Sequence, residues 1–381
     1  MRITIVGAGP VGLLTACLLS REHTVTVLDK RTVSTRTHGL SIDTNTINVI
    51  VNYLESFVLS EEIRYLCDIL RSWENTPVST VDIESQLSDV AGRLGVTIRK
   101  GIAVESIDDI EDSIIIGADG AHSKIRELVF NNEKTDTHDV QYMGQLKYQT
   151  PGATRPRLAI SAMSYSFVNG LSGSDMVVDF ESLAASNDQM RKPGTLHIPI
   201  PESVYTVLSS NGRGNYAAPW SLDELSQINN SQVAKLLRII RRYEFSLKWR
   251  GGWLEDARVT VIPLTIYRSA DVVRILDNNK LVMLLGDASS GLVFERGANK
   301  GFLEAVQCAL TLNNISSETL SEKLAEYSQY CIILYEAERD QVLSKHNKIM
   351  SANKSTSVTG IALTSGLGLS FVKLLSSSWM G

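Results

Sequence analysis

A glycine-rich loop near the start of the chain constrains the fold more than any other feature. Residues 2–6 are a short β-type run, and the loop Gly7-Ala-Gly9-Pro10-Val11-Gly12 joins them to the apolar stretch 13–20. A second apolar run, residues 25–28, ends at Asp29. Strand, glycine loop, helix and strand within about 30 residues predict a βαβ unit that opens a Rossmann-like sheet.

Each glycine of this loop has its own task when a dinucleotide binds. Gly7 permits the tight turn, Gly9 lets a pyrophosphate approach the backbone, and Gly12 lets the helix pack closely on the strand. The N-terminus of the helix supplies free N–H donors and a partial positive charge. Asp29 follows about 20 residues later, where an acidic side chain accepts hydrogen bonds from an adenosine ribose. The unit predicts dinucleotide binding, with FAD and NAD as alternatives; a tight turn without a nucleotide is the plainer interpretation.

The composition sets limits on size, partners and compartment. The chain has 381 residues, 43% of them hydrophobic, and a formal net charge of −5. This length is sufficient for about two domains, and the acidic balance gives no reason to expect a nucleic-acid partner. The four cysteines are far apart and form no cluster with histidines. We therefore expect free buried thiols, a cytoplasmic protein and no metal site.

A second glycine-containing segment, residues 117–126, follows the apolar run 114–116. It reads Gly117-Ala-Asp119-Gly120-Ala-His-Ser123-Lys-Ile-Arg126. Asp119 is suited to anchoring a loop through backbone N–H groups, and Arg126 to pairing with a phosphate or with Asp119. The plainer interpretation is a strand-to-helix turn in which Asp119 and Ser123 are caps.

A third segment, Gly286-Asp287-Ala288, lies at the end of the apolar run 281–285. The Asp287 carboxylate is suited to accepting hydrogen bonds from sugar hydroxyls. Residues 297–301, Gly297-Ala298-Asn299-Lys-Gly301, then begin a helix whose N-terminus can stabilise negative charge.

Together, the three segments resemble the fingerprints of class A FAD-dependent monooxygenases, the para-hydroxybenzoate hydroxylase group. In that family, the segment similar to 117–126 lies near FAD and the docking route of the pyridine nucleotide. The aspartate that corresponds to Asp287 bonds the ribityl hydroxyls of FAD, and the helix start similar to 297–301 points N–H groups at the flavin. The resemblance separates FAD from NAD in favour of FAD.

The loop after Asp29 also resembles this family. Asp29-Lys30-Arg31, followed by Arg36, looks most like the MICAL-type monooxygenases, whose substrate is actin methionine. An arginine of this loop approaches the cofactor in the family, whereas solvated loop charges are the alternative. The cofactor-binding residues that the resemblance implies are Gly7, Gly9, Pro10, Val11, Gly12, Asp29, Lys30, Arg31, Arg36, Gln86, Asp119, Gly120, Arg126, Gly286, Asp287, Gly297, Ala298 and Asn299.

The sequence departs from the family pattern at three places. Glu84 stands three residues before Leu87, where the family has an arginine that reaches the cofactor, so that contact is lost or supplied by Gln86. Residues 292–297 lack the proline and the first glycine of the family's Pro-x-x-Gly-x-Gly, and Ser290 replaces a histidine. These changes point to an unusual or degraded active site.

The resemblance implies an oxidoreductase with FAD as cofactor and NADPH or NADH as co-substrate. NAD(P)H would reduce the flavin, O₂ would form a flavin C4a-hydroperoxide, and one oxygen atom would pass to an electron-rich substrate. That substrate is a small molecule or a methionine-containing protein. The alternatives are an NADPH oxidase or reductase that releases H₂O₂, and a flavin-binding protein with an inactive site. No residue is assigned as catalytic.

The order of the segments predicts a discontinuous domain. Short β-type runs dominate residues 140–208, including 203–208, before buried strands and helix return from residue 258 onward. We expect an α/β fold in which a Rossmann-like FAD-binding domain, residues 1–135 and 256–340, is interrupted by a mainly antiparallel β substrate domain, residues 136–255. Residues 341–381 are expected to be a helical tail, whose apolar end, 359–380, suits either a packed helix or attachment to a membrane surface.

Overall fold

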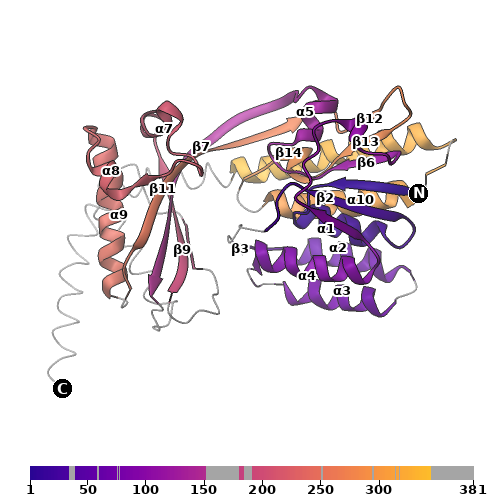
Figure 1. Cartoon of the computed structure of the whole chain (residues 1–381), viewed down its shortest axis with the longest axis horizontal. Helices are drawn as coiled ribbons and strands as arrows, with labels where there is room; N and C mark the ends of the chain where they lie inside the picture. The colour runs from indigo at the N-terminus through magenta and orange to yellow at the C-terminus, as the bar shows by residue number, and fades with distance from the viewer. Residues whose placement is uncertain are drawn as a thin grey trace, which may run out of the picture. The chain divides into compact units, whose positions relative to one another are not determined.

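The computed structural model divides the chain into two compact units (Figure 1). The first contains Met1–His138 and Thr265–Val342, and the second contains Asp139–Leu264 and the residues from Leu343 onward. The residues that the structure describes are 1–33, 39–57, 60–74, 76, 78–151, 180–183, 191–249, 252–293, 296–313, 315–316 and 318–344.

A six-stranded sheet forms the centre of the first unit, in the order β12-β13-β6-β1-β2-β5. Its strands are β1 (Arg2–Val6), β2 (Thr24–Asp29), β5 (Thr97–Lys100), β6 (Ile114–Gly117), β12 (Val273–Ile275) and β13 (Leu281–Leu284). All neighbours are parallel except β12, which runs antiparallel to β13. Val6 is paired with Leu28 and with Gly117, and Gly117 with Leu284. This register places the segments that follow four strands at one edge of the sheet.

Helices pack on this sheet and on one another. They are α1 (Pro10–Leu19), α2 (Thr44–Glu55), α3 (Glu61–Ser72), α4 (Thr80–Arg93), α5 (Lys124–Phe130), α10 (Arg296–Asn313) and a helix over residues 320–344. The short elements of this unit are β3 (Gly39–Leu40), β4 (Val78–Ser79), β14 (Ser290–Gly291) and the 3-10 turns η1 (Ile107–Asp109) and η3 (Gly286–Ala288).

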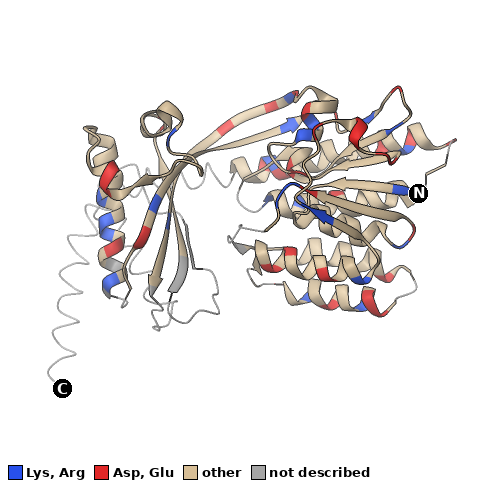
Figure 2. Cartoon of the chain, viewed as in Figure 1, with Lys and Arg blue, Asp and Glu red and all other residues tan. Residues whose placement is uncertain are grey.

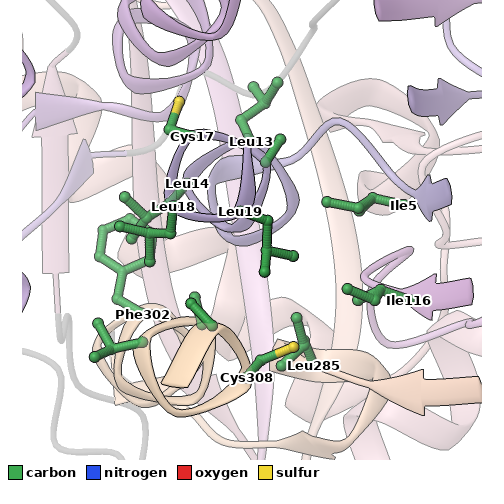
Figure 3. Packing of buried hydrophobic residues seen from close by; sticks show 14 of the residues in the cluster. Ile5, Leu13, Leu14, Cys17, Leu18, Leu19, Ile116, Leu285, Phe302 and Cys308 are labelled. Atoms are coloured by element: carbon green, nitrogen blue, oxygen red, sulfur yellow. The ribbon is translucent and has the colours of Figure 1, made fainter. Parts of the chain in front are cut away.

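Helix α1 is apolar on all sides because it packs on several elements at once. Nine of its ten residues are buried, as expected for a helix without a solvent face. Figure 3 shows Leu14 and Leu18 of α1 pointing toward Phe302 of α10, with Ile5 and Ile116 on the neighbouring strands. The apolar run 13–20 is therefore part of the core that fixes the glycine loop.

The second unit is built on antiparallel strands. They are β7 (Lys134–Pro151), β8 (Phe180–Leu183), β9 (Arg191–Ile200), β10 (Trp220–Ser221) and β11 (Glu255–Ser269), in the order β10-β11-β7-β9-β8. Strands β7 and β11 contain the boundaries between the units. The remaining elements are α7 (Glu202–Ser209), η2 (Ser210–Gly212), α8 (Leu222–Ser226) and α9 (Ser231–Trp249). A separate core joins the sheet to α9 through Leu146, Leu196, Leu236 and Ile240.

Helix α9 carries a polar face opposite this core. Figure 2 shows mainly basic segments along it, and its one acidic residue, Glu244, forms ion pairs with both Arg241 and Lys248. These spacings of three and four residues bring opposite charges together on one helix face.

The expected fold class is confirmed: a Rossmann-like parallel sheet, an antiparallel sheet and a helical C-terminal region. The strand expected over residues 203–208 is wrong, because these residues form α7. Val204 and Leu208 are buried one helical turn apart, and Pro201 precedes the first turn, where a missing N–H has no cost. A period of four therefore prevails over the β-branched composition.

Two expectations fall outside the residues that the structure describes. They concern the β-type runs within 152–179 and the tail 345–381. Within the described part of the chain, no helix has the length and apolar character needed to cross a membrane. The four cysteines all lie in described elements and are buried free thiols, as expected.

Candidate functional site

The three glycine-containing segments meet at the carboxyl edge of the parallel sheet. Backbone hydrogen bonds continue beyond the strands: Gly7 N–H donates to Leu28 O at 2.7 Å, and Ala118 N–H to Val6 O at 2.8 Å. Leu285 N–H donates to Gly117 O at 2.9 Å. Segments separated by more than 100 residues in the sequence are thus held in one row.

Two glycines of the first segment differ in what surrounds them. A Cβ at Gly12 would lie 2.0 Å from Gly7 O, which only glycine allows. Apart from Gly9 and its two chain neighbours, no atom of the described residues lies within 4 Å of the position a Cβ would take at Gly9. Gly12 therefore serves the contact between helix and loop, whereas the backbone at Gly9 borders open space. A space of this kind fits the approach of a pyrophosphate to the backbone.

Asp119 of the second segment caps α5. Its Oδ2 accepts hydrogen bonds from Lys124 N at 2.6 Å and Ile125 N at 3.3 Å, and Ser123 Oγ accepts one from Arg126 N at 2.9 Å. Burial raises the pKa of Asp119 above its usual value against the opposing effect of these bonds. The anchoring role and the capping interpretation thus describe the same geometry, with Gly120 at a positive φ of 85° in the turn.

Arg126 holds the third segment and does not face a ligand. The side chain is 1% exposed, and its Nε donates to Asn132 Oδ1 at 2.9 Å. Nη1 donates to the carbonyl oxygens of Asp287 and Ala288, and Nη2 to that of Ala121. Since every side-chain nitrogen already has a protein acceptor, the expected pairing with a phosphate or with Asp119 is a misassignment. The Tyr267 hydroxyl supports the same turn by donating to Asp287 O at 2.7 Å.

We expect Arg126→Met to destabilise the first unit by about 3 kcal/mol, because buried carbonyl oxygens lose their donors. Urea unfolding measures the change. Arg93→Met is the matched control, since Arg93 is half-exposed on α4 and pairs with Asp89; a change below about 0.5 kcal/mol is expected there. Equal losses in both variants would contradict the role given to Arg126.

A buried ion pair beneath the third segment has no counterpart in the sequence predictions. Lys300 and Glu304 are fully buried, with 2.8 Å between Nζ and Oε1. Glu304 Oε2 accepts from Gly286 N at 2.7 Å, and both its oxygens accept from Ser289 Oγ. Lys300 Nζ also donates to Gly286 O at 3.3 Å. The signal available in the sequence was a lysine and a glutamate four residues apart, with apolar residues between and after them.

The start of α10 is fixed beside Asp287. A Cβ at Gly297 would lie 2.9 Å from Asp287 Oδ1, so the helix backbone approaches this carboxylate closely. Asn299 Oδ1 accepts from Asp43 N at 2.9 Å, and its Nδ2 donates to Ser41 O at 3.0 Å. Ala298 packs on the core as a partly buried side chain. Val11 of the first segment also lies against α10: a Cβ at Gly301 would lie 2.5 Å from Val11 Cγ2.

Asp29 is saturated by protein donors. Oδ1 accepts from Arg31 N at 2.7 Å and Arg31 Nε at 3.1 Å, and Oδ2 from Ala8 N at 2.8 Å and Arg31 Nη2 at 2.9 Å. Burial alone would raise the pKa of Asp29, but the bonds from Arg31 and Ala8 outweigh it and lower the pKa. Arg31 Nη1 also lies 3.7 Å from Glu84 Oε1 of α4.

A pocket of about 260 Å³ adjoins this ion pair. Lys30 is exposed. Gln86 is not among the residues that line the pocket, and its Oε1 accepts a hydrogen bond from Trp73 Nε1 at 2.8 Å. Arg36 and residues 294–295 are outside the described chain. The residues that line the pocket are Ala8, Asp29, Arg31, Val33, Val81, Glu84, Ser85, Ser88 and Lys100.

Comparisons with known proteins agree with this architecture. Residues 5–68 match the family model of the NAD(P)-binding Rossmann-like domain. Tetracycline destructase Tet(51) superposes with a TM-score of 0.58 at 16% identity, covering 93% of this chain and 96% of that one. The chain has the flavoprotein monooxygenase fold.

Two further structures share this fold. CtdE, crystallised with FAD and a substrate, gives a TM-score of 0.59 at 12% identity, covering 89% of this chain and 88% of that one. The 2-methyl-3-hydroxypyridine-5-carboxylic acid oxygenase gives 0.53 at 16% identity, covering 93% and 92%. No curated protein matches the chain in sequence.

Proposed function

We propose that this protein is an FAD-dependent monooxygenase that uses NAD(P)H and O₂ to oxygenate an electron-rich small molecule. One observation carries the proposal: the loop at Gly9, the pocket at Asp29 and the Asp287 turn beside α10 lie along one sheet edge. A dinucleotide cofactor needs contacts of this kind in a row.

The chain's own residues suggest how the cofactor would be held. The open backbone at Gly9 and the N-terminus of α1 suit the pyrophosphate, since N–H donors and the helix dipole favour an anion. The pocket beside Asp29 suits adenosine, and the Asp287 carboxylate suits sugar hydroxyls. The N-terminus of α10 favours negative charge on a ring bound next to it. When bound, FAD would supply the redox chemistry between NAD(P)H and O₂.

The relatives in fold support the same class of reaction. One is a tetracycline destructase, one is an oxygenase of a pyridine carboxylic acid, and one was crystallised with FAD and a substrate. A small organic substrate is therefore favoured for this chain. A methionine-containing substrate stays a prediction that rests on the MICAL-type resemblance alone.

Absorption spectroscopy of the purified protein, before and after addition of FAD, tests the cofactor. We expect the bands of oxidised flavin and their loss when NADH or NADPH is added without oxygen. A protein that stays colourless in excess FAD would overturn the proposal. A yellow protein that neither nucleotide bleaches would favour the inactive flavin-binding protein.

Oxygen use after reduction separates the two active alternatives. A monooxygenase is expected to consume reduced nucleotide faster when its substrate is present and to add one oxygen atom to that substrate, detected by mass spectrometry. Nucleotide consumption that is matched by H₂O₂ for every compound in a phenol and pyridine panel would favour the oxidase.

A further inference from the structure

The pocket beside Asp29 contains a second carboxylate, that of Glu84. Glu84 lies on α4 and is 6% exposed. It lines the pocket together with Asp29 and Arg31. Within the described part of the chain no hydrogen bond ends on its carboxylate; its one contact there is the 3.7 Å ion pair with Arg31 Nη1.

The two carboxylates differ in their capacity to accept a ligand. A carboxylate has about four lone-pair sites, and Asp29 receives four N–H groups, three from Arg31 and one from Ala8. Glu84 receives none from the described chain, although a buried carboxylate without hydrogen bonds carries a desolvation cost. A ligand that donates a hydrogen bond would remove that cost at Glu84. At Asp29 there is no such cost to remove, because its lone pairs already accept N–H groups.

The charges of the pocket select the kind of donor. The charged groups that line the pocket are two carboxylates, one guanidinium group and one exposed lysine, Lys100. Arg31 forms ion pairs with both acids, and Nη1 is its one side-chain nitrogen without a hydrogen bond to the described residues. A phosphate placed beside Nη1 would also meet the negative charge of Glu84, 3.7 Å from that nitrogen. A neutral hydroxyl group that donates to Glu84 meets no such repulsion.

We propose that Glu84, and not Asp29, accepts the hydrogen bond from an adenosine ribose hydroxyl of the bound cofactor. Asp29 acts as a positioning residue: it fixes Arg31 and the Ala8 N–H of the glycine loop. This assignment deepens the proposed function and rests on it for FAD as the source of the adenosine.

Calorimetric binding of ADP, 2′-deoxy-ADP and 3′-deoxy-ADP to the full-length protein freed of nucleotide tests the assignment. In the wild type, removal of the bonded hydroxyl is expected to weaken binding about tenfold or more, as for a bond to a charged acceptor. In Glu84→Met, which lacks the acceptor, ADP and both deoxy probes are expected to bind equally. Glu84→Gln, with a neutral acceptor, is expected to give an intermediate ratio.

Asp89→Asn is the matched control, because Asp89 lies on the same helix and pairs with Arg93 outside the pocket. It is expected to keep the wild-type ratio. The assignment is overturned if ADP does not bind, if both deoxy probes bind the wild type as ADP does, or if Glu84→Met keeps the discrimination.

Displacement of ADP by FAD or by NADH separates this inference from the proposed function. FAD is expected to displace ADP. Displacement by NADH alone, with the ratios above intact, would contradict the FAD-dependent function and leave the role of Glu84 standing. Displacement by FAD without any discrimination between the probes would contradict the role of Glu84 and leave the FAD-dependent function standing.

Discussion

Glu304→Gln is expected to destabilise the first unit by about 3–5 kcal/mol, the cost of leaving a buried charge without its partner. The substitution keeps the volume of the side chain, so a cavity does not contribute. Lys300 would remain fully buried, with Ser289 Oγ and Gly286 O as its remaining contacts. Urea unfolding of the full chain measures the loss.

The double variant Lys300→Met/Glu304→Gln separates charge from packing. Removing both charges is expected to restore much of the stability, because an apolar replacement of a buried ion pair is often neutral. Glu326→Gln is the surface control: Glu326 pairs with Lys323 at 2.8 Å in exposed positions, and a loss below about 1 kcal/mol is expected. If the double variant is as unstable as Glu304→Gln, the ion pair is not what holds this site together.

The same pair is expected to act on cofactor affinity. Glu304 Oε2 and Lys300 Nζ bind the N–H and the carbonyl of Gly286, next to Asp287. Replacing the carboxylate by a neutral amide weakens the bond from Gly286 N, and this loosens the turn that presents the Asp287 carboxylate. FAD affinity is therefore expected to fall in Glu304→Gln under conditions in which the variant is still folded, as judged by circular dichroism.

The part of the site that depends on chain order was predictable from the sequence. The glycine loop, the acid at the end of β2 and the two later glycine segments each follow a buried strand, and parallel strands bring such segments to one edge. The pairing of Val6 with both Leu28 and Gly117 realises this arrangement. Local spacing was sufficient because each segment is fixed by its own strand.

The features of the site that could not be predicted from the sequence depend on contacts between elements. Arg126 finds its acceptors at Asp287 and Ala288, about 160 positions away along the chain. The role proposed for Glu84 depends on the hydrogen bonds by which Arg31 already occupies Asp29. Neither fact has a local pattern, since a residue's partners are set by packing and not by its neighbours in sequence. The strand predicted over residues 203–208 was wrong for a different reason: burial with a period of four overrode strand propensity.

Gly9→Ala is expected to abolish tight FAD binding without harming the fold. Gly9 has φ −80° and ψ 177°, which any residue adopts, and its added methyl group would meet no atom of the described chain within 4 Å. Stability is therefore expected to stay within about 1 kcal/mol of the wild type, with a small gain from a less flexible unfolded chain.

The methyl group would instead occupy the space into which the pyrophosphate must come. Hydrogen bonds from backbone N–H groups to charged oxygens contribute about 1.5–3 kcal/mol each. Loss of one or two corresponds to about a hundredfold weaker FAD binding. Fluorescence titration of the nucleotide-free protein with FAD gives the affinity, and urea unfolding gives the stability.

Gly12→Ala is the contrasting variant because its Cβ would lie 2.0 Å from Gly7 O. There the helix must move away from the loop, and we expect the loss to appear in stability as well as in FAD binding. The two variants change the same loop by the same methyl group and differ only in what that group meets. If Gly9→Ala binds FAD as the wild type does, the open space above the loop is not where the pyrophosphate lies, and the placement of the cofactor along this sheet edge fails with it.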